Sequence, residues 1–178
     1  MTLTDTQKYI ITSAIRDIPD FPEPGIVFKD ISTLLNDKEA FKVLMDHLCD
    51  RYKTYDLDFI AGIDARGFIF GAAVAYRLGV GFIPIRKPGK LPHETMGQTY
   101  DLEYGQDTVE VHKDAVKQGD QVLVIDDVLA TGGTVEAVCE LLTKMGADIA
   151  GIGFLMELTF LNGIKRIEKY PVNALIKY

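Results

Sequence analysis

The segment 122–134, VLVIDDVLATGGT, combines two neighbouring carboxylates with a turn of small residues. Asp126 and Asp127 follow the apolar run VLVI, which is typical of a buried strand. Successive residues of a strand point to opposite faces, so one carboxylate could accept hydrogen bonds from a diol while the other faces a metal ion or a second hydroxyl. Acidic residues at the ends of strands are common, so the pair alone is weak evidence of a binding site.

A small-residue turn comes next, and a predicted helix follows it. The residues of the turn are Ala130, Thr131, Gly132, Gly133 and Thr134. Glycines allow close backbone approach, and the N–H groups at a helix N-terminus favour an anion such as phosphate. The whole segment therefore predicts a site for a phosphorylated ribose. The alternative is a capped helix after a buried strand, with both aspartates merely solvated. A Walker A loop is excluded, because no lysine follows the second glycine.

Basic residues are concentrated in 65–100 of a chain whose net charge is −7. Against the single acid Glu94, this region holds Arg66, Arg77, Arg86, Lys87 and Lys90. The acidic net charge argues against general nucleic-acid binding, which needs a basic face. A basic region in an acidic chain suits a small, highly anionic ligand, although a solvated surface fits the composition equally well.

Continuous apolar runs alternate with helical patterns in the second half of the chain. The runs are DFIAGI at 58–63, VGFIPI at 80–85, VLVI at 122–125 and IAGIGFLMEL at 149–158. This alternation predicts an α/β fold, a doubly wound, mainly parallel sheet flanked by helices. With 178 residues and no repeat or linker, the chain is expected to form a single domain, 1–178.

The N-terminal region is expected to begin with a helix and then to lose regular structure. Thr4 and Gln7 have capping-box spacing, and the apolar stripe that follows extends to Ile18. The stretch FPEPG at 21–25 then breaks regular structure. A second helix is expected to open at Asn36.

Residues 87–108 do not fit the alternation, since they hold two prolines, three glycines and few apolar anchors. A stretch of this length without regular structure usually forms a lid or a binding loop. The following TVEVHK alternates like a half-exposed strand, which predicts that the loop is the tip of a long hairpin or flap.

Cys49 and Cys139, the only cysteines, are expected to be buried thiols in helices. The histidines show no metal-ligand spacing, and His47 is read as a helix-surface residue. The N-terminus lacks a signal-peptide pattern, and no apolar run approaches the roughly 20 residues of a membrane span. We therefore expect a cytoplasmic protein without membrane contact.

The segment 122–134 closely resembles the phosphoribosyl-pyrophosphate motif of the type I phosphoribosyltransferases. Three further segments resemble the adenine-specific members of that family: FPEPGIVFKDIS at 21–32, GIDARGFIFG at 62–71 and the flap ending in DLEYG at 101–105. The resemblance runs over nearly the whole chain. It implies the type I fold, with an N-terminal hood at 1–35 and a flexible flap at 87–108.

The resemblance also implies where the sugar and its 5-phosphate bind. Asp126 and Asp127 would hold the ribose 2- and 3-hydroxyls. The turn at 130–134 would hold the 5-phosphate.

The resemblance likewise implies a pyrophosphate site. Asp64 and Ala65, which precede Arg66, resemble the family's pyrophosphate loop, which is often built around a non-proline cis peptide. Arg66, Arg86 and Lys87 would clamp the pyrophosphate. Lys90, on the flap, fits either the clamp or an ordinary surface charge.

Adenine would lie under the N-terminal hood. Backbone groups at Val27 and Lys29 would read the edge of the base, and Phe28 would stack on its ring. The alternative is that Phe28 belongs to a core and that FPEPG is a rigid loop. Family members often carry arginine at the position of Lys29, which leaves any side-chain contribution open.

The implied reaction transfers the 5-phosphoribosyl group from phosphoribosyl pyrophosphate to adenine, giving AMP and pyrophosphate. Mg²⁺ is expected to bind mainly through substrate oxygens, so no protein residue is assigned as its ligand. Glu103 is the candidate for acid/base work on the purine, an exposed loop glutamate being the alternative. Tyr104 would cover the closed site. Similar enzymes are homodimers, so a second copy is the expected partner besides the small-molecule substrates.

Two rival functions stay open. Backbone recognition leaves little side-chain information on the base, so the substrate could be another purine such as hypoxanthine or xanthine. The chain could also be a non-catalytic sensor of phosphoribosyl pyrophosphate, although such a regulator would be expected to carry an added DNA-binding element.

Overall fold

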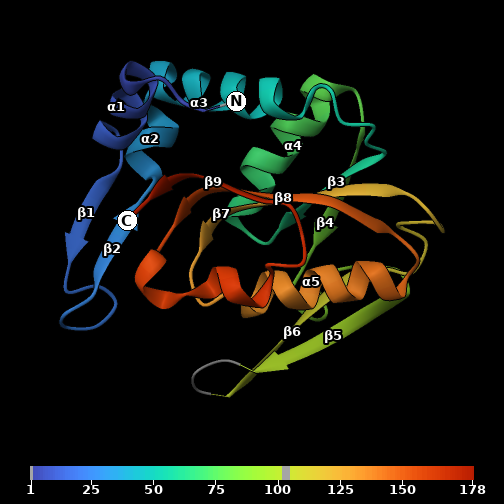
Figure 1. The fold of residues 1–178 in the computed structure, drawn as a ribbon. Helices are drawn as coiled ribbons and strands as arrows, with labels where there is room; N and C mark the ends of the chain where they lie inside the picture. The colour runs from blue at the N-terminus through green and yellow to red at the C-terminus, as the bar shows by residue number, and fades with distance from the viewer. Residues whose placement is uncertain (1, 102–104) are drawn as a thin grey trace. The chain divides into compact units, whose positions relative to one another are not determined.

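The computed structural model describes residues 2–101 and 105–178. The chain divides into two compact units, Met1–Lys53 and Thr54–Tyr178. Each unit has its own helices and strands (Figure 1). The single domain and the hood at 1–35 stay predictions.

Among its described residues, the first unit contains three helices and one short hairpin. Its elements are α1 (Asp5–Ser13), β1 (Arg16–Pro19), β2 (Val27–Asp30), α2 (Ser32–Asn36) and α3 (Lys38–Tyr52). The predicted capping box is confirmed: the Thr4 hydroxyl accepts from the Gln7 N–H, and the Gln7 side chain accepts from the Thr4 N–H. Both α1 and α2 pack on α3.

Three details of this unit differ from the sequence-based expectation. The first helix ends before Ile18, which lies in β1 and pairs with Phe28 of β2 in an antiparallel hairpin. Cross-strand pairing therefore replaces the expected last helical turn. Asn36 ends α2 and does not open a helix, because Asp37 caps α3 by accepting from two backbone N–H groups. His47 is 4% exposed and lies on the buried side of α3, not on the surface.

The second unit is built on a parallel sheet. Its strands lie in the order β4 (Gly81–Ile85), β3 (Phe59–Ile63), β7 (Gln121–Leu129), β8 (Asp148–Glu157) and β9 (Val172–Lys177). Each neighbouring pair in this described sheet is parallel. The helices α4 (Arg66–Leu78) and α5 (Gly133–Lys144) cover opposite faces (Figure 1). The predicted doubly wound α/β fold is confirmed.

A continuous apolar core fixes the strands relative to α5. It joins Ile85, Val124 and Phe154 of the sheet to Val138 and Leu142 of the helix, all almost fully buried. Two short 3-10 helices, η1 (Thr159–Leu161) and η2 (Gly163–Arg166), connect β8 to β9. The carboxyl ends of β3 and β7 are therefore held close to the starts of α4 and α5, where ligands of open α/β sheets bind.

The predicted flap, residues 87–108, contains β5 (Thr95–Asp101) and the start of β6 (Gln106–His112), which pair as an antiparallel hairpin. The predicted long hairpin is confirmed, but the expectation that 87–108 lacks regular structure is wrong for both strands. Every residue from Thr95 to Asp101 has a cross-strand partner, and β5 also packs on α5. Pairing and packing thus order a stretch that has few apolar anchors.

Cys49 and Cys139 are buried, as predicted, and burial raises the pKa of Cys139 to about 12. None of the helices in the described part of the chain combines the length and the apolarity needed to cross a membrane.

Candidate functional site

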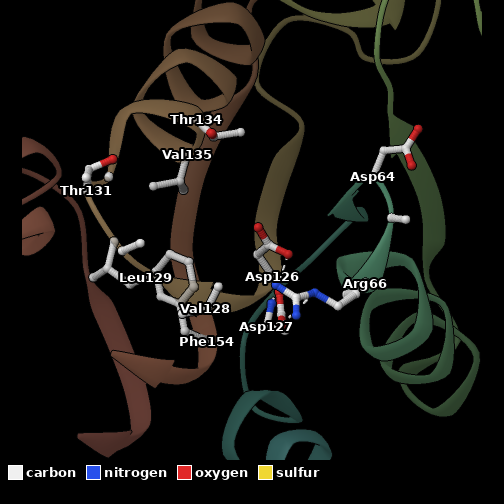
Figure 2. A pocket seen from close by; sticks show the side chains of 13 residues that line it. Asp64, Arg66, Asp126, Asp127, Val128, Leu129, Thr131, Thr134, Val135 and Phe154 are labelled. Atoms are coloured by element: carbon white, nitrogen blue, oxygen red, sulfur yellow. Dashed lines mark hydrogen bonds and ion pairs between the residues drawn. The ribbon is translucent and has the colours of Figure 1, made fainter. Parts of the chain in front are cut away.

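Two carboxylates lie side by side in β7, close to its carboxyl end. The strand continues to Leu129, so Asp126 and Asp127 lie within it and not after its end. The Asp126 carboxylate accepts from the backbone N–H of Asp127 at 2.9 Å. Asp127 is 3% exposed, and its Oδ2 lies 3.0 Å from Nε of Arg66 (Figure 2).

The Asp127–Arg66 contact leaves a hydrogen-bond acceptor unused. The two charges touch, yet Oδ2 of Asp127 finds no aligned donor among the residues that the structure describes. Buried acceptors normally have a donor, so this oxygen is suited to a ligand hydroxyl. Burial raises the pKa of Asp127, although the Arg66 charge opposes the rise. Burial, and then the Asp127 charge, raise the pKa of Asp126 well above its ordinary value.

The turn predicted to bind phosphate, residues 130–134 and called the phosphate turn below, lies at the start of α5. The helix begins at Gly133 and is preceded by Gly132, whose φ of +85° is readily adopted only by glycine. No side chain caps this helix within the described residues, so its first N–H groups are available to an anion. Thr131 is exposed, and the Thr134 hydroxyl donates to the Tyr100 hydroxyl at 3.1 Å.

A second backbone segment supports this turn from behind. A Cβ added at Gly163 would lie 2.1 Å from the carbonyl oxygen of Ala130, and one added at Gly132 would lie 2.5 Å from that of Gly163. The two segments can approach this closely only without side chains. Sequence reasoning missed Gly163, although the dipeptide Asn162-Gly163 is a turn signal.

The predicted pyrophosphate loop connects β3 to α4. The peptide bond between Asp64 and Ala65 is cis, and Arg66 is the first residue of α4. A Cβ on the next residue, Gly67, would lie 2.8 Å from the carbonyl oxygen of Ile125. Glycine at this position therefore lets α4 start directly against β7, which brings Arg66 within reach of the carboxylates.

The other predicted clamp residues follow β4. The Arg86 guanidinium donates to the Asp64 carboxylate at 3.1 Å and to the Lys90 carbonyl at 3.1 Å. Lys87 forms an ion pair with Asp107 of β6 and donates to the Tyr100 hydroxyl at 3.4 Å. The Lys90 side chain is exposed.

Most of the predicted ligand-binding residues line one cavity of about 210 Å³ (Figure 2). Its wall contains Asp64, Ala65, Arg66, Asp126, Asp127, Ala130, Thr131, Gly132 and Thr134. Apolar side chains, among them Leu129, Val135 and Phe154, complete the wall. Gly133, Arg86, Lys87 and Lys90 are not part of it, although Arg86 contacts Asp64.

The remaining predicted residues belong to the first unit or lie outside the described residues. Val27, Phe28 and Lys29 belong to β2 of the first unit. Phe28 packs edge to face on Phe21 with a centroid distance of 5.3 Å, and Lys29 pairs with Asp17 at 2.7 Å. Glu103 and Tyr104 lie outside the described residues.

The carboxylates do not form a metal cluster. Within residues 2–101 and 105–178, no group of three or more His, Cys, Asp or Glu side chains is placed to hold a metal ion. The cavity instead offers three carboxylates, of Asp64, Asp126 and Asp127, together with one guanidinium and an uncapped helix start, which suit hydroxyl donors and a phosphate.

Comparison with known proteins identifies the family. Residues 30–175 match the phosphoribosyl transferase domain. The adenine phosphoribosyltransferase of Desulfitobacterium hafniense is 53% identical over 178 residues, which is 100% of both chains.

Comparison with solved structures supports the same family. The adenine phosphoribosyltransferase of Thermoanaerobacter pseudethanolicus has a TM-score of 0.91 at 51% identity and covers 94% of this chain and 98% of its own. That of Saccharomyces cerevisiae, complexed with an imino-altritol bisphosphate and adenine, has a TM-score of 0.90 at 38% identity, over 97% and 99% of the two chains. The chain therefore belongs to the phosphoribosyl transferase domain family and, within it, to the adenine phosphoribosyltransferases.

Proposed function

We propose that this chain transfers the 5-phosphoribosyl group from phosphoribosyl pyrophosphate to adenine, producing AMP and pyrophosphate in purine salvage. The observation that carries the proposal is the cavity that joins Asp126 and Asp127 to the uncapped start of α5 and to Arg66. The relatives of full matching length that bear the adenine phosphoribosyltransferase name support the same reaction.

The sugar phosphate would lie in the cavity with its 5-phosphate toward the start of α5. The 5-phosphate would bind the N–H groups of 130–134 and the hydroxyls of Thr131 and Thr134. The ribose hydroxyls would then face the two carboxylates, and one would donate to the unused Oδ2 of Asp127. Donors around these carboxylates would lower their raised pKa values and hold both groups ionised.

The leaving pyrophosphate gains negative charge as the bond to ribose carbon 1 breaks. Arg66, Arg86 and Lys87 are the cations that would stabilise it, with the loop at Asp64 and Ala65 contributing the backbone. Mg²⁺, held mainly by oxygens of phosphoribosyl pyrophosphate, would neutralise the same charge. Lys90 would add a further cation from the exposed segment after β4.

The part of the site that would bind adenine is inferred from the family resemblance alone. Val27 and Lys29 would read adenine through their backbone, and Phe28 would stack on it. Glu103 would exchange a proton with the purine, and Tyr104 would cover the site when the flap closes. A closed flap would exclude water, which could otherwise capture the ribosyl group.

The composition and the family resemblance also suggest a cellular location and partners for the enzyme. We expect a cytoplasmic homodimer with small-molecule substrates and neither a nucleic acid nor a membrane as partner. The acidic net charge supports the first exclusion.

A turnover assay with Mg²⁺, phosphoribosyl pyrophosphate and one purine at a time tests the proposal. We expect AMP from adenine at a rate well above the rates with hypoxanthine, guanine and xanthine. Equal or faster turnover of an oxopurine would overturn the assignment of adenine. Tight binding of phosphoribosyl pyrophosphate without AMP formation would instead indicate a non-catalytic sensor.

A further inference from the structure

Tyr100 and Asp107 connect the two ends of the proposed substrate site. They are direct cross-strand partners in the β5–β6 hairpin, and the Tyr100 hydroxyl donates to the Asp107 carboxylate at 3.1 Å. The same hydroxyl accepts from Thr134 of the phosphate turn at 3.1 Å and from the Lys87 ammonium at 3.4 Å. Asp107 also pairs with Lys87. One hydroxyl thus touches a 5-phosphate residue and a pyrophosphate residue.

The hydrogen bonds of this cluster can run in only one direction. Lys87 has donors alone, and an ionised Asp107 can only accept. The Tyr100 proton therefore goes to Asp107, and the Thr134 proton goes to Tyr100. With one donor and two acceptor sites used, the Tyr100 hydroxyl is saturated. In this arrangement Thr134 has no proton left for a phosphate.

The Lys87 ammonium is held by the same cluster. Its side chain is 42% exposed and that of Asp107 is 28% exposed, so the pair is partly shielded from water. Partial burial by itself would lower the pKa of Lys87, but the hydrogen bonds from Lys87 to Asp107 and Tyr100 outweigh burial and raise it. The bond from Lys87 lowers the pKa of Asp107. Lys87 is thus charged and already has an anionic partner.

We propose that Tyr100 is a positioning residue that couples the 5-phosphate site to the pyrophosphate site by reversing its hydrogen bond. A phosphate at 130–134 would take the Thr134 proton, and the Tyr100 hydroxyl would then donate to Thr134 Oγ1 in place of Asp107. Asp107 Oδ2 would lose one of its two donors and attract the Lys87 ammonium more strongly. Pyrophosphate, which must displace Asp107 to reach Lys87, would then compete with a tighter ion pair.

This coupling rests on the proposed function and has a definite sign. Occupation of the phosphate turn should weaken pyrophosphate binding, and the effect must be reciprocal. Two anions in one site also repel each other, so the total coupling contains a second unfavourable part that is purely electrostatic. Tyr100→Phe removes only the hydroxyl and leaves all charges in place, so comparison with wild type isolates the contribution of the hydrogen-bond reversal.

The experiment measures the Kd of inorganic pyrophosphate by calorimetry, with and without saturating ribose 5-phosphate, at fixed Mg²⁺. The ratio of the two Kd values expresses the coupling. We expect the ratio in wild type to disfavour joint binding by about fivefold to tenfold more than in Tyr100→Phe, a difference typical of one intramolecular hydrogen bond. Asp107→Asn should bind pyrophosphate more tightly than wild type when ribose 5-phosphate is absent, because the competing anion is gone.

Two control variants separate coupling from loss of folding. Asp101→Asn alters the neighbouring cross-strand pair, in which the carboxylate accepts from Gln106 at 2.9 Å. Tyr170→Phe removes a tyrosine hydroxyl outside the hairpin. Both should keep the wild-type ratio, and melting temperatures should show that all variants fold.

The possible outcomes are distinguishable. An unchanged ratio in Tyr100→Phe, with wild type active in AMP synthesis, would overturn the coupling and leave the proposed function intact. Weaker pyrophosphate binding in Asp107→Asn would overturn the displacement of Asp107. A wild-type chain that binds neither ligand and makes no AMP would overturn both the coupling and the proposed function.

Discussion

Asp126 carries an electrostatic cost in the folded chain that its proposed role as a ribose ligand would explain. Its pKa lies well above the ordinary 3.8, first because of burial and then because of the Asp127 charge. A carboxyl with a raised folded-state pKa contributes stability that is fully present below pH 3.8 and is lost as the pH rises through the folded-state pKa. At neutral pH this carboxyl therefore destabilises the ligand-free fold.

Asp126→Asn should make the ligand-free chain more stable at pH 7 and less active. The amide keeps the shape of the carboxylate without its charge, and each kcal/mol gained raises Tm by about 2–4 °C for a chain of this size. Loss of a charge-assisted acceptor for ribose should lower kcat/KM for phosphoribosyl pyrophosphate by about tenfold or more.

Thermal denaturation of Asp126→Asn and wild type at pH 7 and at about pH 4 checks the electrostatic cause. The advantage of the variant should shrink at the lower pH, where the wild-type carboxyl is protonated in the folded chain. An advantage of the same size at both pH values would show that the charge is not responsible.

At the scale of elements, the phosphate turn depends on a segment that follows β8. The backbone of Gly163 packs directly on Ala130 and Gly132, and neither Gly132 nor Gly163 has room for a Cβ. The start of α5 is thus fixed by two turns, only one of which is expected to touch the ligand. This close backbone contact explains how an uncapped helix start can hold a defined shape.

Gly163→Ala should displace the phosphate turn. The added methyl would lie 2.1 Å from the Ala130 carbonyl oxygen, so one of the two backbones must move. Overpacking of this kind typically costs about 1–3 kcal/mol. We expect the KM for phosphoribosyl pyrophosphate to rise by about tenfold, with a smaller change in the KM for adenine, in steady-state kinetics with each substrate varied.

Gly97→Ala is the matched control for this substitution. A Cβ at Gly97 has its nearest contact at 3.5 Å, an ordinary van der Waals distance. A Gly163→Ala variant with a lowered Tm but an unchanged KM for phosphoribosyl pyrophosphate would refute the supporting role of Gly163.

At the scale of the whole molecule, the sequence predicts those parts that depend on local pattern. Four strands of the described parallel sheet show as continuous apolar runs, whereas β9, with the sequence VNALIK, does not. The turn at 130–134 shows as TGGT before a helix. The β1–β2 and β5–β6 hairpins are less visible, because pairing with a distant strand orders residues that have weak patterns of their own.

Local sequence patterns likewise reveal only part of the candidate site. The sequence suggests Asp126, Asp127 and Arg66, because each belongs to a motif. It does not suggest Tyr100 or Asp107, since their importance arises from contacts with Lys87 and Thr134 that only the folded chain creates. Long-range contacts of this kind leave no local spacing in the sequence.

The expected homodimer leads to the last prediction. Ile69 and Tyr76 lie seven residues apart on α4, and thus on one side of the helix, with exposures of 41% and 90%. This helix starts at Arg66, so a second copy covering that side would also steady the pyrophosphate loop. Tyr76→Asp should weaken self-association by about tenfold or more, since buried tyrosines often dominate interfaces. The loss of the dimer should also lower the rate of turnover. Sedimentation velocity measures the self-association of wild type and of Tyr76→Asp. The control variant is Tyr9→Asp, which changes a tyrosine on α1 that is 72% exposed. A monomeric wild type, or a Tyr76→Asp variant that dimerises normally, would contradict an interface on α4.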